Sequence, residues 1–394
     1  MERDVSFKRW KLLLLIVTIV GCAATLFLWQ ANRIAGGSGF PLDDAWIHAR
    51  FADNLARGHG FSYNRGTPSS GSTSPLWAFL LAATYALGVA PIPAGLTWGI
   101  LFLMASCWIT YRLALAVGQS PFVGVTATVF TALMARLIWG ALSGMEVSLY
   151  VYLALLALIW HVHYDPNSGF RSYFSTIALA LAALARPECY ILFPVAWLDR
   201  ILTSKHRLTC TVIAFLSHLI LYVLILAPNW AFNISITGSI FPATFHAKVQ
   251  GGILEALRIG DIQLLLVALT TRPLYFIRQY ILFWIENNVV LLIPACWGLV
   301  SLIRRRHRTG SVIVPLVFVI FPLAIGVFSG WGELVGRYIA NLIPLYAVMA
   351  AIGIEEITKW VQTLHQEFPI DIRLSSSRYL WAESGQAINI EQGW

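Results

Sequence analysis

The chain has 394 residues, of which 58% are hydrophobic and 12% are charged, and its mean hydropathy is +0.70. Soluble domains carry about 25% charged residues, so this composition excludes an ordinary soluble domain and predicts an all-α polytopic membrane protein. The formal net charge of +8 does not indicate a nucleic-acid partner. The basic residues form short clusters between apolar runs, where they act as topology signals.

Motifs for nucleotide-driven chemistry are missing from the sequence. It contains no P-loop, no dinucleotide-binding glycine fingerprint and no His-Glu-x-x-His motif. The five cysteines include no Cys-x-x-Cys pair, so neither a disulfide framework nor a zinc site is expected. The sequence therefore gives no support for energy coupling by a nucleotide.

The first apolar run covers residues 12–29 and follows a basic segment, which predicts an uncleaved first span with its N-terminus in the cytoplasm. A polar stretch, "GFPLDDAWIHARFADNLARGHG", comes directly after it. Its helical rhythm over 42–56 predicts an amphipathic helix lying in the membrane interface. We expect this helix to open a first external loop at 31–93.

Later apolar runs of roughly 18 to 25 residues extend the prediction to a bundle of about ten transmembrane helices. A shorter run at 74–88 is expected to lie in the interface, within the first external loop. The expected crossings after the first are 94–117, 121–142, 145–163, two short helices within 173–198, and then 208–228, 288–303, 311–329 and 339–357.

The segment 173–198 is interrupted by Arg186-Pro187-Glu188. Proline removes a helical hydrogen bond and pushes the residue before it out of the helical region. Both ends of the segment are expected in the cytoplasm, because a basic loop follows it. We therefore predict a hairpin of two short helices with Arg-Pro-Glu at its outer tip.

The transmembrane catalytic domain is expected over 1–357, with a second external loop, bearing interfacial helices, at 229–287. The polar tail 358–394 is expected in the cytoplasm and is too short for a domain with its own core. In this topology five polar groups reach the same outer face, namely 43–44, 143–146, 186–188, 241–248 and 332–338. Their convergence predicts one external active site.

Acidic residues supply the candidate catalytic groups. Asp43 and Asp44 fall in the first turn of the predicted interfacial helix, where simple helix capping is the alternative explanation. Glu146 begins a span, which is ordinary for an acid. Arg186 and Glu188 form a charged pair at a break in an apolar hairpin, which is expensive and often functional, although a local salt bridge is the alternative.

Cations on an outer face run against the positive-inside rule. His246, Lys248, Arg337 and Arg50 are therefore candidates for binding the phosphate of an anionic headgroup. Anchoring to lipid headgroups is the alternative. Trp46 and Tyr338 are expected to support the site.

A polyprenyl-phosphate sugar presents its headgroup at this depth of the membrane. A carboxylate can deprotonate an acceptor hydroxyl as a general base, while cations stabilise the departing phosphate. A divalent metal, Mg or Mn, is a possible helper, and its candidate ligands are Asp43, Asp44 and Glu146. The expected partners are the lipid-linked donor, a glycan or lipid acceptor and membrane lipid.

The first external loop resembles that of bacterial GT-C glycosyltransferases, close to the mycobacterial terminal arabinofuranosyltransferase group. The matching motifs there are Asp43-Asp44-Ala45-Trp46, Arg50-Phe51-Ala52-Asp53-Asn54-Leu55, Gly58-His59-Gly60, Tyr63-Asn64 and Thr73-Ser74-Pro75-Leu76-Trp77. Later similar signatures are Ser-Gly-Met-Glu at 143–146, Ala-Arg-Pro-Glu at 185–188, Pro-x-Thr-Phe-x-Ala-Lys at 242–248 and Gly-Arg-Tyr at 336–338. Members of that group carry a larger external domain after the bundle, in place of the short tail here.

The resemblance implies a GT-C fold, inverting transfer from a polyprenyl-phosphate sugar, and an acid of the first external loop as the base. Asp43, as the first of the pair, is the expected base and Asp44 the alternative. The expected location is a bacterial inner membrane with the site on the extracytoplasmic side. Two other functions remain open, a lipid-linked sugar transporter or flippase and an assembly subunit without activity. A transporter would place ionisable groups near the midplane and show internal repeats, neither of which the sequence indicates.

Overall fold

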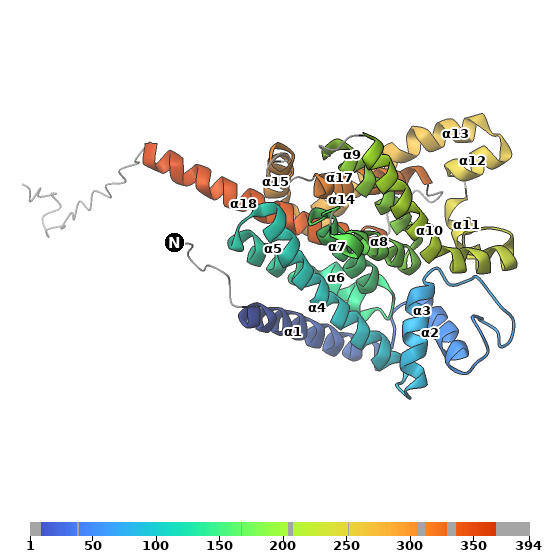
Figure 1. Ribbon diagram of the computed structural model, residues 1–394. Coiled ribbons are helices and arrows are strands. Elements are labelled where there is room, and N and C mark those ends of the chain that lie inside the picture. Colours follow the sequence, from blue (N-terminus) through green and yellow to red (C-terminus); the bar gives the residue numbers. More distant parts are fainter. Residues whose placement is uncertain are drawn as a thin grey trace, which may run out of the picture. The chain divides into compact units, whose positions relative to one another are not determined.

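The computed structural model describes residues 9–37, 39–166, 168–203, 208–250, 252–305, 312–328 and 336–367. Within these ranges every regular element is helical, which confirms the all-α fold class (Figure 1). The first half contains α1 (Arg9–Ala35), α2 (Asp43–Ala56), α3 (Pro75–Ala86), α4 (Pro91–Gly118), α5 (Pro121–Leu133), α6 (Ala135–Leu142), α7 (Val147–Val162), η1 (Gly169–Tyr173) and α8 (Phe174–Ala185).

The second half of the chain also combines long and short helices. It contains η2 (Pro187–Ile191), α9 (Leu192–Thr203), α10 (Leu208–Thr237), α11 (Ala243–Val249), α12 (Ile253–Ile259), α13 (Ile262–Leu269), α14 (Thr271–Asn288), η3 (Val289–Leu291), α15 (Leu292–Arg304), α17 (Ile313–Phe328), η4 (Gly336–Tyr338) and α18 (Leu342–Glu367). One compact unit extends to Glu355, and the rest of the chain forms a separate unit.

Proline marks the start of several helices in the first half. Pro75, Pro91 and Pro121 each occupy the first helical position of α3, α4 and α5, where the missing N–H costs nothing and the fixed φ suits the helix. The predicted interfacial helix is present as α2, and it packs along α3 (Figure 1). The polar first loop is therefore a structured pair of helices.

Helices α7, α8 and α9 run back and forth beside one another. Ser175 at the start of α8 donates to the carbonyl of Ala157, near the end of α7, at 3.0 Å. Arg186, after α8, reaches Glu146, just before α7. Asp199 in α9 then lies 2.7 Å from His161, at the end of α7 again. The chain reverses at Arg186-Pro187, so the structure contains the predicted hairpin.

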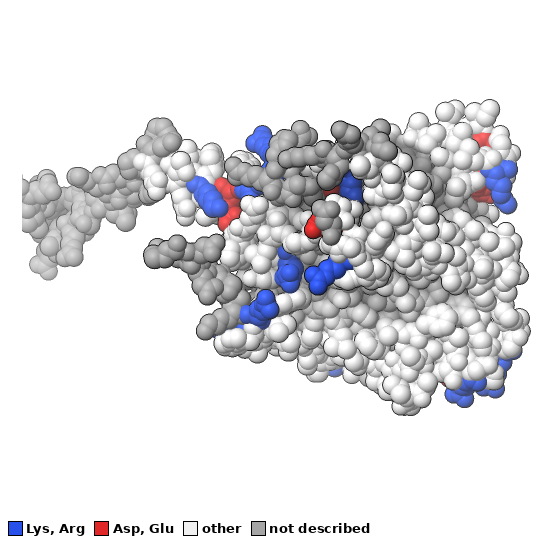
Figure 2. Space-filling view, viewed as in Figure 1, with Lys and Arg blue, Asp and Glu red and all other residues white. Residues whose placement is uncertain are grey.

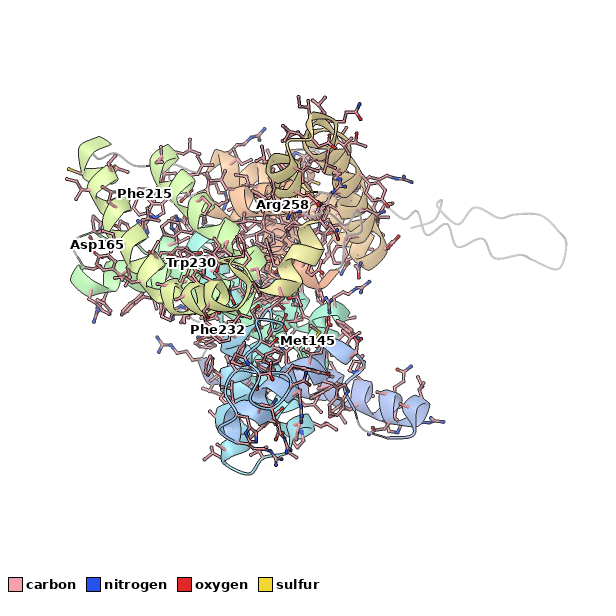
Figure 3. The ribbon with its side chains drawn as sticks, turned by 90° about the vertical axis from the view of Figure 1, so that its right-hand side faces the viewer. Met145, Asp165, Phe215, Trp230, Phe232 and Arg258 are labelled. Atoms are coloured by element: carbon pink, nitrogen blue, oxygen red, sulfur yellow. The ribbon has the colours of Figure 1, made fainter. Side chains whose placement is uncertain are left out.

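The two ends of α7 carry different polar clusters. Figure 3 shows Met145, just before α7, well separated from Asp165, just after it. At the Asp165 end, His161 contacts Asp199, and His218 accepts or donates a 2.6 Å hydrogen bond with Thr176. His161 thus links α7 to α9, and His218 links α10 to α8. The Met145 end holds the candidate site.

Four segments are long and apolar enough to cross a membrane, namely α1, α4, 210–237 and 262–304, and the pair α5 and α6, bent by 55°, makes a fifth. Figure 2 shows a broad face on which charged side chains are few. The protein is thus a multi-pass helical membrane protein. Shorter apolar helices, including α3, α7 and α17, complete the bundle, and the expected total of about ten crossings remains a prediction.

The boundary predicted at Pro228 is wrong. Helix α10 continues through this proline to Thr237 instead of ending there. Proline is tolerated inside such helices because neighbouring groups can satisfy the carbonyl that it frees. The predicted second external loop therefore begins inside a helix. It contains the short helices α11 and α12, but α13 and α14 belong to the segment 262–304 that is apolar enough to cross a membrane.

Candidate active site

Asp44 pairs with a cation that is almost three hundred positions away in the sequence. Its Oδ2 lies 2.7 Å from Nη1 of Arg337, which belongs to η4. Asp43 is exposed, and its Oδ1 accepts the backbone N–H of Asp44 at 2.9 Å. Leu42 is the N-cap of α2, so neither acid acts as the side-chain cap. The two neighbouring carboxylates therefore have different surroundings.

The turn between α6 and α7 carries a buried acid at the centre of an ionic network. Glu146 is 1% exposed, and its Oε1 lies 2.5 Å from Nη1 of Arg186. Its Oε2 lies 3.1 Å from Nε2 of His48. Both oxygens of this buried carboxylate therefore face a nitrogen that is cationic or belongs to an imidazole.

Arg186 is held on two sides. Besides Glu146, it donates to Glu188 through Nη2 at 3.0 Å and through Nε at 3.2 Å, a bidentate fork. Its guanidinium also lies 5.3 Å from the ring of Tyr150 and 5.1 Å from the ring of Tyr338. One buried cation thus joins the α6–α7 turn, the hairpin tip and η4.

Two connections link this network to the Asp44–Arg337 pair. The hydroxyl of Tyr150 donates to the backbone carbonyl of Arg337 at 2.6 Å. Nη1 of Arg337 also lies 3.4 Å from Sδ of Met145, the neighbour of Glu146. Within the described part of the chain, the buried Nε of Arg337 has no hydrogen-bond partner. Such an orphaned donor is uncommon in a folded protein and suits a site that binds an anion.

His48 is a member of the site that the sequence analysis did not single out. It is buried, contacts Glu146 and shares a 3.2 Å hydrogen bond with Ser72 through Nδ1. It lies four residues after Asp44, so both face the same side of α2. That spacing is the signal that would have identified it. Tyr150 gives no such signal, because its position inside an apolar helix is unremarkable in sequence.

The α6–α7 turn requires a glycine. Gly144 has φ +76°, and a Cβ at this position would run into the ring of Phe40. Its carbonyl accepts from Nε1 of Trp77 at 3.1 Å. Phe40 in turn packs on the ring of Trp46, with centroids 5.0 Å apart. These contacts fix the approach of Glu146 and Met145 to α2, and Trp46 itself is largely exposed.

The second loop lies against the first. The backbone N–H of Ala243 donates to Ser70 at 3.3 Å, and the hydroxyl of Thr244 donates to the carbonyl of Gly71 at 3.4 Å. The side chains of His246 and Lys248, on the same α11, lie outside the described residues. Their proposed contact with phosphate therefore stays a prediction.

Arg50 is engaged within the first loop. Its Nε donates to the carbonyl of Tyr63 at 3.2 Å, and its Nη1 lies 3.8 Å from Asp53. Asn54 donates to the same carbonyl at 2.9 Å and to that of Ser62 at 2.8 Å. These bonds order the loop after α2, and the structure does not bring Arg50 into contact with Arg337.

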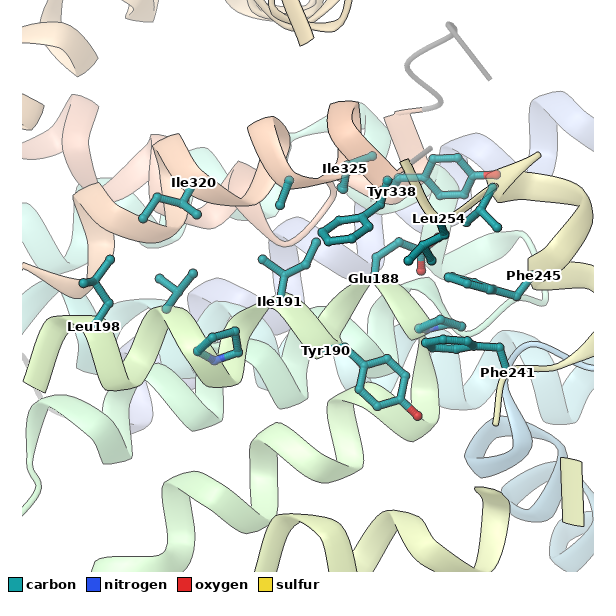
Figure 4. A pocket seen from close by; sticks show the side chains of 16 residues that line it. Glu188, Tyr190, Ile191, Leu198, Phe241, Phe245, Leu254, Ile320, Ile325 and Tyr338 are labelled. Carbon is teal, nitrogen blue, oxygen red and sulfur yellow. The ribbon is translucent and has the colours of Figure 1, made fainter. Parts of the chain in front are cut away.

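An elongated cavity of about 510 Å³ opens beside the network (Figure 4). Glu188 and Tyr338 line one part of it, close to Phe241 and Phe245. Apolar side chains line the remainder, among them Ile191, Pro194, Val195 and Leu198 from η2 and α9, and Ile320, Ala324, Ile325 and Phe328 from α17. The lining runs from Glu188 in η2 to Leu198 in α9, so the groove follows η2 and the first half of α9 away from its polar end.

The metal proposed from the sequence fits these residues poorly. Both oxygens of Glu146 already face cations or His48, and Asp44 is paired with Arg337. The described residues contain no group of three side chains of the types His, Cys, Asp and Glu that is arranged to hold a metal ion. Asp43 and Asp44 alone supply two of the three side chains that such a site needs.

Comparison with solved structures identifies proteins of similar fold. The apo form of the oligosaccharyltransferase of Archaeoglobus fulgidus aligns with 92% of this chain and 52% of its own, at a TM-score of 0.60 and 11% identity. The complex of the same enzyme with Zn and sulfate aligns with 89% of this chain and 50% of its own, at 0.58 and 14% identity. That enzyme has a polytopic GT-C fold.

The chain has the GT-C fold. At these identities the likeness is one of fold, and the chain spans about half the length of that oligosaccharyltransferase. No protein-family model matches the sequence, and no curated protein matches it. The arabinofuranosyltransferase resemblance therefore rests on the motifs alone.

Proposed function

We propose that the protein is an integral membrane glycosyltransferase that moves a sugar from a polyprenyl-phosphate donor to a cell-envelope acceptor. One observation carries the proposal. A long apolar groove ends at charged and aromatic residues, Glu188 and Tyr338, and Arg337, the sequence neighbour of Tyr338, pairs with Asp44. The GT-C fold supports the same reaction class.

The shape of the groove matches the chemistry of the donor. A polyprenyl chain needs an apolar slot, and the groove between α9 and α17 supplies one. A phosphate needs a cation at the end of that slot. Arg186 cannot serve, because Glu146 and Glu188 already surround its buried guanidinium. Arg337 can, because it lies in η4 together with Tyr338, and its Nε has no hydrogen-bond partner among the described residues.

The reaction is an inverting displacement. A carboxylate removes the proton from the acceptor hydroxyl, and the resulting oxygen attacks the anomeric carbon of the sugar. The bond between that carbon and the phosphate oxygen breaks, and the polyprenyl phosphate leaves with the electron pair. Arg337 stabilises the negative charge that develops on the leaving phosphate. Atoms and charge balance without a nucleotide or a redox partner.

The two acids take different roles in this proposal. Asp44 faces Arg337 and positions its guanidinium. Asp43 is exposed and accepts only a backbone hydrogen bond in the described structure, so its second oxygen is available to an acceptor hydroxyl. We therefore assign the general base to Asp43, with Asp44 as the alternative base once phosphate displaces it from Arg337.

The proposed donor sugar and membrane location follow from the sequence motifs and the basic loops. The resemblance to the mycobacterial arabinofuranosyltransferase group favours an arabinofuranosyl donor. The same resemblance favours a bacterial inner membrane, and the basic loops favour an orientation in which α2 and the groove open on the extracytoplasmic side.

The test uses purified protein in proteoliposomes with a panel of polyprenyl-phosphate sugars, including the arabinofuranosyl form, and membrane-extracted envelope glycan as acceptor. We expect release of polyprenyl phosphate and a product with inverted anomeric configuration. Movement of intact donor between leaflets without transfer would support a flippase and overturn the proposal. Transfer with retained configuration would reject the single displacement.

A further inference from the structure

A second cavity, of about 370 Å³, adjoins the groove between α9 and α17. The two share the side chains of Phe241, Phe245, Val249 and Leu254. The second cavity adds Gln250, Glu255 and Arg258, and it does not include the aliphatic residues of α9 and α17. The two cavities therefore share part of their lining, and the second is lined by more polar side chains than the first.

Two stacked rings form the wall between the cavities. The ring centroids of Phe241 and Phe245 lie 4.2 Å apart, with planes inclined by 21°. Tyr190 meets Phe241 edge-on at 5.9 Å, which fixes the orientation of the pair. The apolar face of a sugar ring packs well on such a flat aromatic surface, whereas a flexible lipid chain does not need one.

The polar side carries three different hydrogen-bonding groups. Gln250 offers an amide, and Glu255 and Arg258 face each other at 3.5 Å across one turn of α12. Glu255 is 20% exposed and Arg258 is 76% exposed, so the pair lies at the solvent-exposed mouth of the cavity. Amide, carboxylate and guanidinium together supply the donors and acceptors that sugar hydroxyls require.

We propose that this second cavity binds the acceptor as a carbohydrate chain, with Phe241 and Phe245 as its stacking surface. The inference rests on the proposed transferase function and extends it by naming the chemical class of the acceptor. The donor sugar would lie at the Glu188–Tyr338 end of the groove, and the acceptor glycan would enter past Arg258. The aromatic pair then separates the lipid chain from the glycan.

The first test is photo-crosslinking of the full-length protein in native membranes. A benzophenone amino acid replaces Gln250 in one variant and Leu198, at the apolar end of the groove, in another. Replacement of the exposed Arg57 serves as the background control. Adducts are digested and examined by mass spectrometry for sugar fragments and for isoprenoid fragments.

We expect glycan-bearing adducts from position 250 and isoprenoid-bearing adducts from position 198. Lipid adducts alone, or no adducts above background, at position 250 would overturn the acceptor site while leaving the donor groove intact. The absence of isoprenoid at position 198 would instead reject the proposed function itself. The two failures are therefore distinguishable.

The second test is kinetic and uses membrane-extracted envelope glycan as acceptor. The double variant Glu255→Gln/Arg258→Ala is expected to raise the acceptor KM about tenfold, because two charge-assisted contacts to hydroxyls are lost. The donor KM should stay within about twofold, and Arg57→Ala should change neither. A rise in the donor KM alone would show that the cavity belongs to the donor.

Discussion

Oδ2 of Asp44 lies 2.7 Å from Nη1 of Arg337, so the first helix after the first span is joined to the turn before the last helix. The pair is partly exposed, with 40% of the Asp44 side chain and 16% of the Arg337 side chain accessible. In the proposed reaction this guanidinium binds the donor phosphate. The contact also gives two adjacent acids different surroundings, since Asp43 accepts a backbone hydrogen bond and Asp44 faces Arg337.

Asp43→Asn should reduce kcat by at least about a hundredfold, because loss of a general base typically costs that much or more. Asp44→Asn should mainly raise the donor KM, because Arg337 loses the partner that orients it. Initial rates of sugar transfer in proteoliposomes, at varied donor concentration, separate the two effects. Full activity in both variants would remove the carboxylates from the mechanism.

Arg337→Ala should lower kcat/KM for the donor by about a hundredfold, and Arg337→Lys should recover part of it, because Lys supplies charge without the guanidinium fork. The double variant Arg337→Ala/Asp44→Asn should lose less donor-binding free energy than the sum of the losses in the two single variants, because the two residues act as a pair. A double-mutant cycle on donor affinity measures this coupling. Strict additivity would mean that the contact has no part in donor binding.

Glu146→Gln should destabilise the protein by about 3 kcal/mol, because it leaves the buried Arg186 with one fewer compensating charge. The matched control is Asp53→Asn, which breaks partly exposed pairs with Arg50 and Arg57 and should cost less than about 1 kcal/mol. Thermal unfolding in detergent, followed by tryptophan fluorescence, compares them. Equal midpoints for the two variants would show that the buried network contributes little to stability.

Gly144→Ala should destabilise the site severely, because the position combines φ +76° with a Cβ that meets Phe40. Gly66→Ala is the matched control, since Gly66 has φ +71° but no atom within 4 Å of the added Cβ. Both variants suffer the same backbone strain, of order 1–2 kcal/mol. The excess loss of stability and activity in Gly144→Ala then measures the contact with Phe40. Equal losses would mean that only the backbone strain matters.

Single cysteines placed at Arg57 and at Phe170, in a background with the five native cysteines replaced, should label from opposite sides of the membrane. Arg57 is the exposed C-cap residue of α2, and Phe170 lies in η1, beyond the far end of α7. We expect Arg57→Cys to react with a membrane-impermeant maleimide from the extracytoplasmic side. Labelling of both cysteines from one side would reject the proposed topology.

The sequence by itself determined the helical class, most of the helices and the groups that meet at the site. Apolar run length, proline position and basic loops depend on local physics, so they predicted α2, α4, α7 and the reversal at Arg186 without knowledge of packing. The error at Pro228 arose because helix continuation there depends on neighbours that a local rule does not include.

Only the tertiary structure decided which of these groups are partners. It joined Asp44 to Arg337, enclosed Arg186 between two acids, and brought His48 and Tyr150 into the site. It also showed the apolar groove and the polar cavity beside it. Pairing and cavity shape depend on how helices distant in sequence pack against one another, and no local pattern encodes that.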